Sequence, residues 1–180
     1  MIFAGPALAD DLKPPVSSFE QMSALVGNWK REGTDGLKFH IQFELTANDS
    51  VLIERWVRGD KTHSLRLYHR DQADLVATHY CPQGNQPRMK MSTPDGAAKI
   101  VFDFWDATNL VKPTDNHQHS LSFDLSEPGR VKRAETYLSS AGEEPSEMVW
   151  CERNKMIGDS SFYMCNCKKG AEIFLRAPFL

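Results

Sequence analysis

The sequence predicts an all-β protein: a single antiparallel up-and-down β-barrel of about ten strands, preceded by a short helix. Apolar and polar residues alternate along a series of short segments, as they do in strands with one buried face. Turns of hairpin length join these segments, and no helical pattern lies between them, which excludes a parallel sheet. Closing the sheet into a barrel removes its unpaired edges, and a two-sheet sandwich is the alternative.

The helix is predicted over residues 17–26. A serine lies three residues before Glu20 or Gln21, which is the spacing of a capping box. Gly27 suits the position after the last helical turn. The apolar residues at helical spacing are Phe19, Met22, Leu25 and Val26.

The strands follow in sequence order, and turn residues such as Pro94, Asp95 and Gly96 separate them. The clearest alternation runs from Leu37 to Leu45, and Leu65 and Leu67 share one face of a later strand. The predicted strands are Trp29–Glu32, Leu37–Leu45, Val51–Arg58, His63–His69, Leu75–Cys81, Arg88–Met91, Ala98–Phe104, His117–Leu125, Val131–Leu138 and Glu147–Arg153.

The composition limits the function classes. The chain has 180 residues, of which 41% are hydrophobic and 25% charged, as in one ordinary globular domain. Its formal net charge of −3 offers no basic field for a nucleic acid. No apolar run approaches the roughly 20 residues of a transmembrane helix.

The two ends of the chain are expected to lie outside the barrel. We divide the sequence into a lead-in or signal-peptide remnant (1–15), the barrel (16–155) and an atypical tail (156–180). Ala7-x-Ala9 resembles a signal-peptide cleavage site, so a periplasmic or secreted location and a cytoplasmic one both stay open. The cysteines leave the redox state open, since Cys81 and Cys151 pair only if the fold brings them together.

A barrel of about ten strands encloses more volume than an eight-stranded one, so a ligand cavity is expected. Burial against inward-facing aromatic side chains would provide most of the affinity for an apolar ligand. These side chains are Phe39, Phe43, Phe102, Phe104 and Phe123.

Histidines are the candidate polar groups of this cavity. His117 and His119 lie two apart in an alternating strand with Leu121, and His79 has the inward parity of its own strand. Three neutral imidazoles in one cavity would suit zinc, copper or iron. A polar cluster that contacts the ligand without a metal is the second interpretation, and a structural role for the histidines is the third.

Arg88 is a further candidate contact, because its guanidinium could hold an anionic head group. A structural ion pair with a strand carboxylate is the alternative, and the candidate partners are Glu54, Glu135 and Glu152. Tyr80 lies between His79 and Cys81 and is a candidate ligand contact. Glycine-rich phosphate loops, nucleophile elbows and paired catalytic carboxylates are not recognisable in the sequence.

Gly27-x-Trp29, between the helix and the first strand, resembles the opening motif of lipocalins and related calycin barrels. The resemblance implies that Trp29 closes one end of the barrel and that Arg153 from the last strand lies over it. Further motifs resemble a family of uncharacterised bacterial calycin-like barrel proteins over about residues 19–153. These motifs are Thr78–Cys81, Gly84–Met89, Asp106–Leu110 and His117-x-His119.

The resemblance implies the fold and no particular reaction, and its nearest analogies are barrels that hold apolar molecules or haem. We therefore expect binding of a small apolar or amphipathic molecule inside the barrel. One alternative is an enzyme that acts on such a ligand through a metal or through histidine acid–base catalysis. Another is haem binding through an interior histidine.

Overall fold

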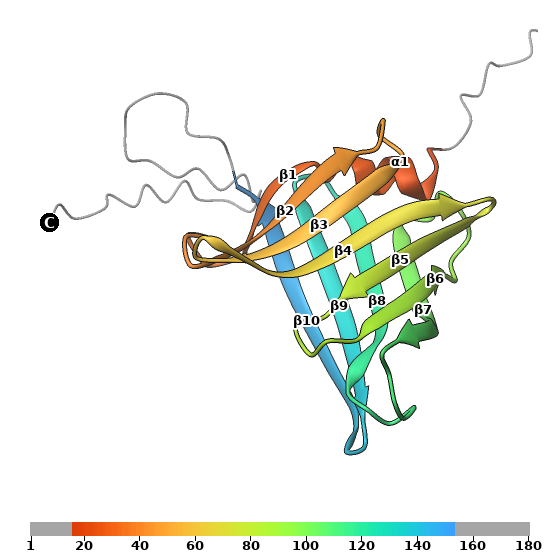
Figure 1. The fold of residues 1–180 in the computed structure, drawn as a ribbon. Helices are drawn as coiled ribbons and strands as arrows, with labels where there is room; N and C mark the ends of the chain where they lie inside the picture. Colours follow the sequence, from red (N-terminus) through yellow and green to blue (C-terminus); the bar gives the residue numbers. More distant parts are fainter. Residues whose placement is uncertain (1–15, 154–180) are drawn as a thin grey trace, which may run out of the picture.

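The computed structural model describes residues 16–153, which form a closed barrel of ten antiparallel strands and one short helix (Figure 1). The predicted fold class is confirmed, and the sandwich alternative is wrong. The signal-like residues 7–9, the cysteines at 165 and 167 and the predicted tail lie outside the described residues. Within residues 16–153, no helix has both the length and the apolar character needed to cross a membrane.

Each strand pairs with its neighbours in the chain, and β1 pairs with β10 to close the barrel. The closing register places Trp29 opposite Glu152 and Arg31 opposite Trp150. The elements are α1 (Ser18–Ser23), β1 (Gly27–Arg31), β2 (Phe39–Thr46), β3 (Val51–Arg58), β4 (Lys61–Asp71), β5 (Asp74–Tyr80), β6 (Gln86–Met91), β7 (Lys99–Thr108), β8 (His117–Glu127), β9 (Arg130–Ser139) and β10 (Gly142–Glu152).

Several predicted boundaries differ from the observed ones, including those of the helix and of β10. The helix ends at Ser23, and Gly27, predicted to follow its last turn, begins β1 with a φ of +142°. Strand β10 begins at Gly142 and not at Glu147, because backbone pairing with β9 extends it beyond the barrel core. Residues 142–147 are exposed, so neither face of this part of the strand requires apolar residues.

Helix α1 covers one end of the barrel (Figure 1). The Ser18 backbone N–H donates to the Asp95 carboxylate at 2.6 Å, which ties the helix to the β6–β7 loop. Trp29 is buried below the helix, and its Nε1 donates to the Leu25 carbonyl at 2.7 Å. The Arg153 side chain lies beside Gly36, and its charge acts on His40. We call the opposite end, where β8 begins, the far end.

Apolar side chains from all ten strands form a core inside the barrel. Phe39, Trp56 and Trp150 form an aromatic group with ring centroids 5.2–5.9 Å apart. The face that Leu65 and Leu67 share is the outer one, since the buried positions of β4 alternate with them. Those inner positions of β4 carry polar side chains.

The capping box of α1 is formed by Ser17 and Glu20. We expect Ser17→Ala to lower the free energy of unfolding by about 1 kcal/mol, because the Ser17 hydroxyl accepts the Glu20 backbone N–H. Urea unfolding measures this change. Ser17→Thr keeps the capping oxygen and should lie within a few tenths of a kcal/mol of wild type; equal losses in both variants would contradict the capping role.

Candidate functional site

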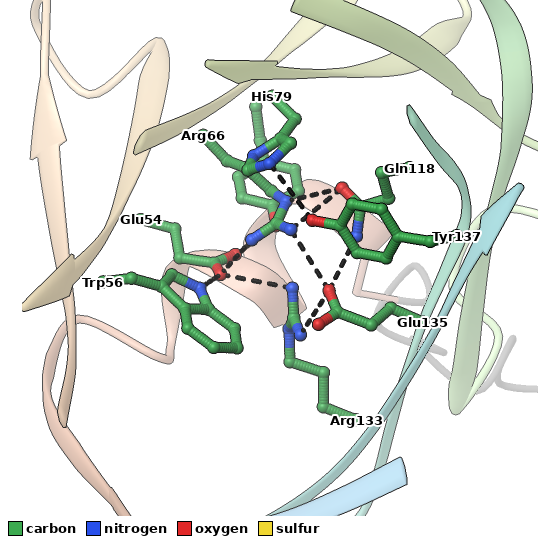
Figure 2. A network of polar contacts seen from close by, with 9 residues as sticks. Glu54, Trp56, Arg66, His79, Gln118, Arg133, Glu135 and Tyr137 are labelled. Atoms are coloured by element: carbon green, nitrogen blue, oxygen red, sulfur yellow. Dashed lines mark hydrogen bonds and ion pairs between the residues drawn. The ribbon is translucent and has the colours of Figure 1, made fainter. Parts of the chain in front are cut away.

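A set of charged and polar side chains lies in the interior of the barrel (Figure 2). We call these residues the charged network, and each contacts at least two others. They come from β3, β4, β8 and β9, so the network spans the barrel from one wall to the other. Its members are Glu54, Arg66, Gln118, Arg133 and Glu135.

Glu54 is fully buried, and four donors surround its carboxylate. The Trp56 indole N–H and the Tyr68 hydroxyl donate to its two oxygens. Arg66 Nη1 donates to Glu54 Oε1 at 2.8 Å, and Arg133 Nη2 lies 3.4 Å from Oε1. The buried negative charge is therefore compensated by two cations and two neutral donors.

Glu135 is the second acidic centre. Its Oε2 accepts from Arg66 Nη2 at 3.2 Å, Arg133 Nη1 at 2.9 Å and Gln118 Nε2 at 2.7 Å. Gln118 Oε1 accepts from Arg66 Nε at 3.0 Å and from Nη2 at 2.9 Å. Two guanidinium groups thus face two carboxylates, and the formal charges of the network cancel.

Arg133 also packs against aromatic rings. Its Cζ lies 4.7 Å from the Trp56 ring centroid and 5.6 Å from that of Phe123. Beside it lies a cavity of about 10 Å³, which Trp29 and Trp150 also line and which has room for about one water molecule. The cavity that the strand number predicts is therefore not of ligand size at this place, because long arginine and tryptophan side chains fill the wider barrel.

The network alters the ionisation of its members. Burial alone would raise the pKa of Glu54, but Arg66, Arg133 and the two hydrogen bonds outweigh it and hold the pKa below its ordinary value. Burial and the Glu54 charge raise the pKa of Tyr68 well above its ordinary value. Burial lowers the pKa of Arg66, but Glu54 and Glu135 outweigh it and raise the pKa overall. Glu54 and Arg66 are therefore charged, and Tyr68 neutral, at neutral pH.

His79 and Tyr137 adjoin the network (Figure 2). The Tyr137 hydroxyl and His79 Nε2 are 3.4 Å apart. Burial, reinforced by the charges of Arg66 and Arg133, lowers the pKa of His79 to about 2. Burial raises the pKa of Tyr137 to about 12. Both side chains are therefore uncharged at neutral pH.

His117 and His119 form a second pair at the far end. His117 Nε2 lies 3.2 Å from His119 Nδ1, and Phe104 packs against both rings with centroid distances of 4.6 and 5.3 Å. A register shift after Gln118 makes His119 the extra residue of a bulge. The bulge interrupts the alternation expected along this strand. Gln118 therefore joins the charged network, and both imidazoles pack on Phe104.

We call His79, Phe104, His117, His119 and Tyr137 the far-end cluster. The pairing of β8 with β9 places Tyr137 opposite Gln118, the residue between the two histidines in the sequence. His79 and His117 are each 1% exposed, whereas the other three members are partly exposed. The Tyr137 hydroxyl faces His79, so the partly exposed members of the cluster are Phe104, His119 and the remainder of the Tyr137 side chain.

Two other predicted contacts lie outside the barrel interior. Arg88 pairs with Asp106 through two hydrogen bonds and lies over the partly exposed ring of Trp105 at 4.6 Å. Tyr80 is 43% exposed, because it follows the inward-facing His79. Arg88 thus has the structural ion pair that was the alternative, with an aspartate in place of the predicted glutamates.

The predicted phenylalanines line the inner wall, but most of them belong to the packed core. Phe43, Phe102 and Phe123 are buried, and Phe39 packs against the core. Phe104 alone of the five joins the histidine pair. Cys81 is a buried free thiol, so it does not pair with Cys151.

The structure lends no support to the predicted metal site at His79, His117 and His119. Between residues 16 and 153, no three histidine, cysteine, aspartate or glutamate side chains are grouped so that they could hold a metal ion. His79 instead faces Tyr137, and His117 and His119 face each other. This arrangement provides two pairs rather than a convergent triad.

The charged network as a whole was not predicted, although Glu54 and Glu135 were named as candidate partners of an arginine. A signal was present in β9, where Arg133 and Glu135 share the inward parity of Val131. Glu54 likewise shares the inward face of β3 with the buried Leu52. Two acids and two bases at inward positions of different strands indicate a balanced interior group, because unpaired charges are rarely buried.

Comparison of the sequence with models of protein families gives no match, and comparison with curated proteins gives none either.

We expect Glu54→Gln to lower the free energy of unfolding by about 3–5 kcal/mol, because it removes one partner of a buried ion pair and leaves positive charge uncompensated. Urea unfolding at pH 7 measures the loss. The matched control is Glu44→Gln, which breaks the half-exposed pair with Arg55 and should cost less than about 1 kcal/mol. Similar losses of unfolding free energy in both variants would show that the buried Glu54 charge is not coupled to Arg66 and Arg133.

His79 should make stability depend on pH. Its ordinary pKa of 6.5 falls to about 2 in the folded protein, so only the unfolded chain gains its proton between these values. The stabilisation is complete above about pH 6.5 and is lost as the pH falls toward 2, by up to about 1.4 kcal/mol per pH unit.

Unfolding measured between pH 6.5 and 5 should therefore show a smaller pH dependence in His79→Gln than in wild type. Tyr137→Phe retains the imidazole and serves as the control, with the wild-type slope. An unchanged slope in His79→Gln would contradict the burial of a neutral His79.

Proposed function

We propose that the protein binds a small, uncharged, amphipathic molecule at the far end of the barrel. The far-end cluster forms the contact surface, and the charged network holds Tyr137 and its neighbours in place. Two observations carry the proposal. The His79–Tyr137 pair adjoins a buried, charge-balanced group of side chains, and the His117–His119 pair flanks Gln118, a member of that group.

The charged network argues for function because the fold does not require it. Buried ion pairs cost desolvation energy, and well-packed apolar side chains of similar volume often give equal or greater stability. Filling the barrel with Arg66 and Glu54 therefore stabilises the fold no more than apolar side chains of similar volume would. Shifted ionisation of buried groups, as at His79 and Tyr137, is also typical of functional sites.

The charge balance favours an uncharged ligand. Arg66 and Arg133 each face both Glu54 and Glu135, so neither guanidinium is left to neutralise an anion. The surface cation of Arg88 is taken by Asp106. Fatty acids and other carboxylates therefore have no counter-charge in the network, whereas a neutral molecule with one hydroxyl or amide group needs none.

The partly exposed ring of Phe104 provides the apolar contact for the body of such a ligand. The resemblance of the sequence to calycin-like barrels, which hold small molecules, supports the same proposal. Catalysis by a metal or a haem group is not part of it, because His79 is paired with Tyr137 and His117 with His119.

We expect 4-ethylphenol, the smallest convenient neutral amphipathic probe, to bind saturably. In a two-dimensional NMR titration of the full chain, its largest shifts should map to Phe104, His119 and Tyr137. Removal of one hydroxyl in Tyr137→Phe should weaken binding about threefold to tenfold. Tyr80→Phe, which removes an exposed hydroxyl from the outer face, should bind as wild type.

The benzoate analogue, 4-ethylbenzoate, should bind more weakly than 4-ethylphenol, since the paired arginines provide no free cation. Shifts confined to the outer face around Trp105, or tighter binding of the benzoate, would contradict the proposed function.

A further inference from the structure

The hydrogen bonds of the histidine pair determine where its protons lie. His117 Nδ1 is 2.7 Å from the Asp115 carbonyl oxygen, which can only accept, so His117 carries its proton on Nδ1. With both rings neutral, His117 Nε2 is then an acceptor. Its partner at 3.2 Å, His119 Nδ1, must therefore be the donor.

This series of hydrogen bonds leaves one free lone pair on the two imidazoles, at His119 Nε2. No described residue forms a hydrogen bond to that nitrogen, and it is not among the buried polar atoms that lack a partner. His119 is partly exposed, so Nε2 is accessible. The ring is held in place, because it stacks on Phe104 with an interplanar angle of 20° and donates to His117.

We propose that His119 Nε2 is the hydrogen-bond acceptor that selects the ligand, which must carry an O–H or N–H donor next to its apolar body. This inference rests on the proposed function and adds to it the chemical class of the ligand. His117 is the positioning residue, since its own proton is committed to Asp115 and its lone pair to His119.

The same proton arrangement accounts for the missing metal triad. A metal ion binds the unprotonated nitrogen of an imidazole, and the second ring nitrogen donates to an oriented partner. In this pair the lone pair of His117 is used within the protein, so only one nitrogen of the two rings is available. One nitrogen can accept a donor hydrogen but does not make a zinc site.

The selectivity is tested with a matched pair of probes. In 4-ethylanisole a methyl group replaces the phenolic hydrogen of 4-ethylphenol, so the molecule can accept but not donate. Wild-type protein should bind the phenol about threefold to tenfold more tightly. The difference should disappear in His119→Phe and persist in the outer-face control Tyr80→Phe.

The outcomes separate the two proposals. Equal affinity of both probes at the far end of wild-type protein, or a preference that survives in His119→Phe, would overturn the role of His119 and leave the proposed function standing. If neither probe shifts the resonances of the far-end cluster, the proposed function itself fails.

The proton positions are tested without any ligand. Nitrogen-15 NMR of the imidazoles at neutral pH should show an unprotonated Nε2 and a protonated Nδ1 in His119, and the same tautomer in His117. His117→Gln should convert His119 to a mixture of tautomers, a change that a merely space-filling His117 would not cause. A proton on His119 Nε2 in the neutral wild-type ring would overturn the inference.

Discussion

The ion pairing of Arg66 and Arg133 with Glu54 and Glu135 is the interaction on which the barrel interior depends. Four charged side chains from three strands lie together in the interior, where burying any one of them alone would have a large unfavourable desolvation energy. Removing one therefore leaves its partners buried and unpaired. Gln118 joins them from β8, the strand next to the one that carries Arg133 and Glu135. The set is neutral as a whole, and this neutrality allows it to be buried at neutral pH.

The network determines what the rest of the interior can do. Its long side chains fill the centre of a wide barrel and leave a cavity of about 10 Å³ beside Arg133. The ligand that we propose is therefore assigned to the far end, since His79 and Tyr137 adjoin the network there. The bulge at His119 adds an oriented imidazole to that end. Packing and charge balance thus follow from the same few side chains.

Much of the fold and part of the site could be predicted from the sequence. Alternation identified all ten strands, and parity placed His79 inside, because both depend on local periodicity. Arg66 was missed, since the leucines on the outer face of β4 disguise which face is buried. Gln118 was missed because a bulge changes the parity of one strand and leaves no local signature. Contacts between distant strands also depend on the register of the closed barrel, which alternation alone does not specify.

Nitrogen-15 NMR of the arginine guanidinium groups tests the central claim most directly. If Arg66 and Arg133 are held by two carboxylates in the interior, their Nη–H protons should give separate, slowly exchanging signals at neutral pH. Arg55, which is paired on the surface, should give the averaged signal of a freely rotating group. Averaged, rapidly exchanging signals from Arg66 and Arg133 would contradict the account.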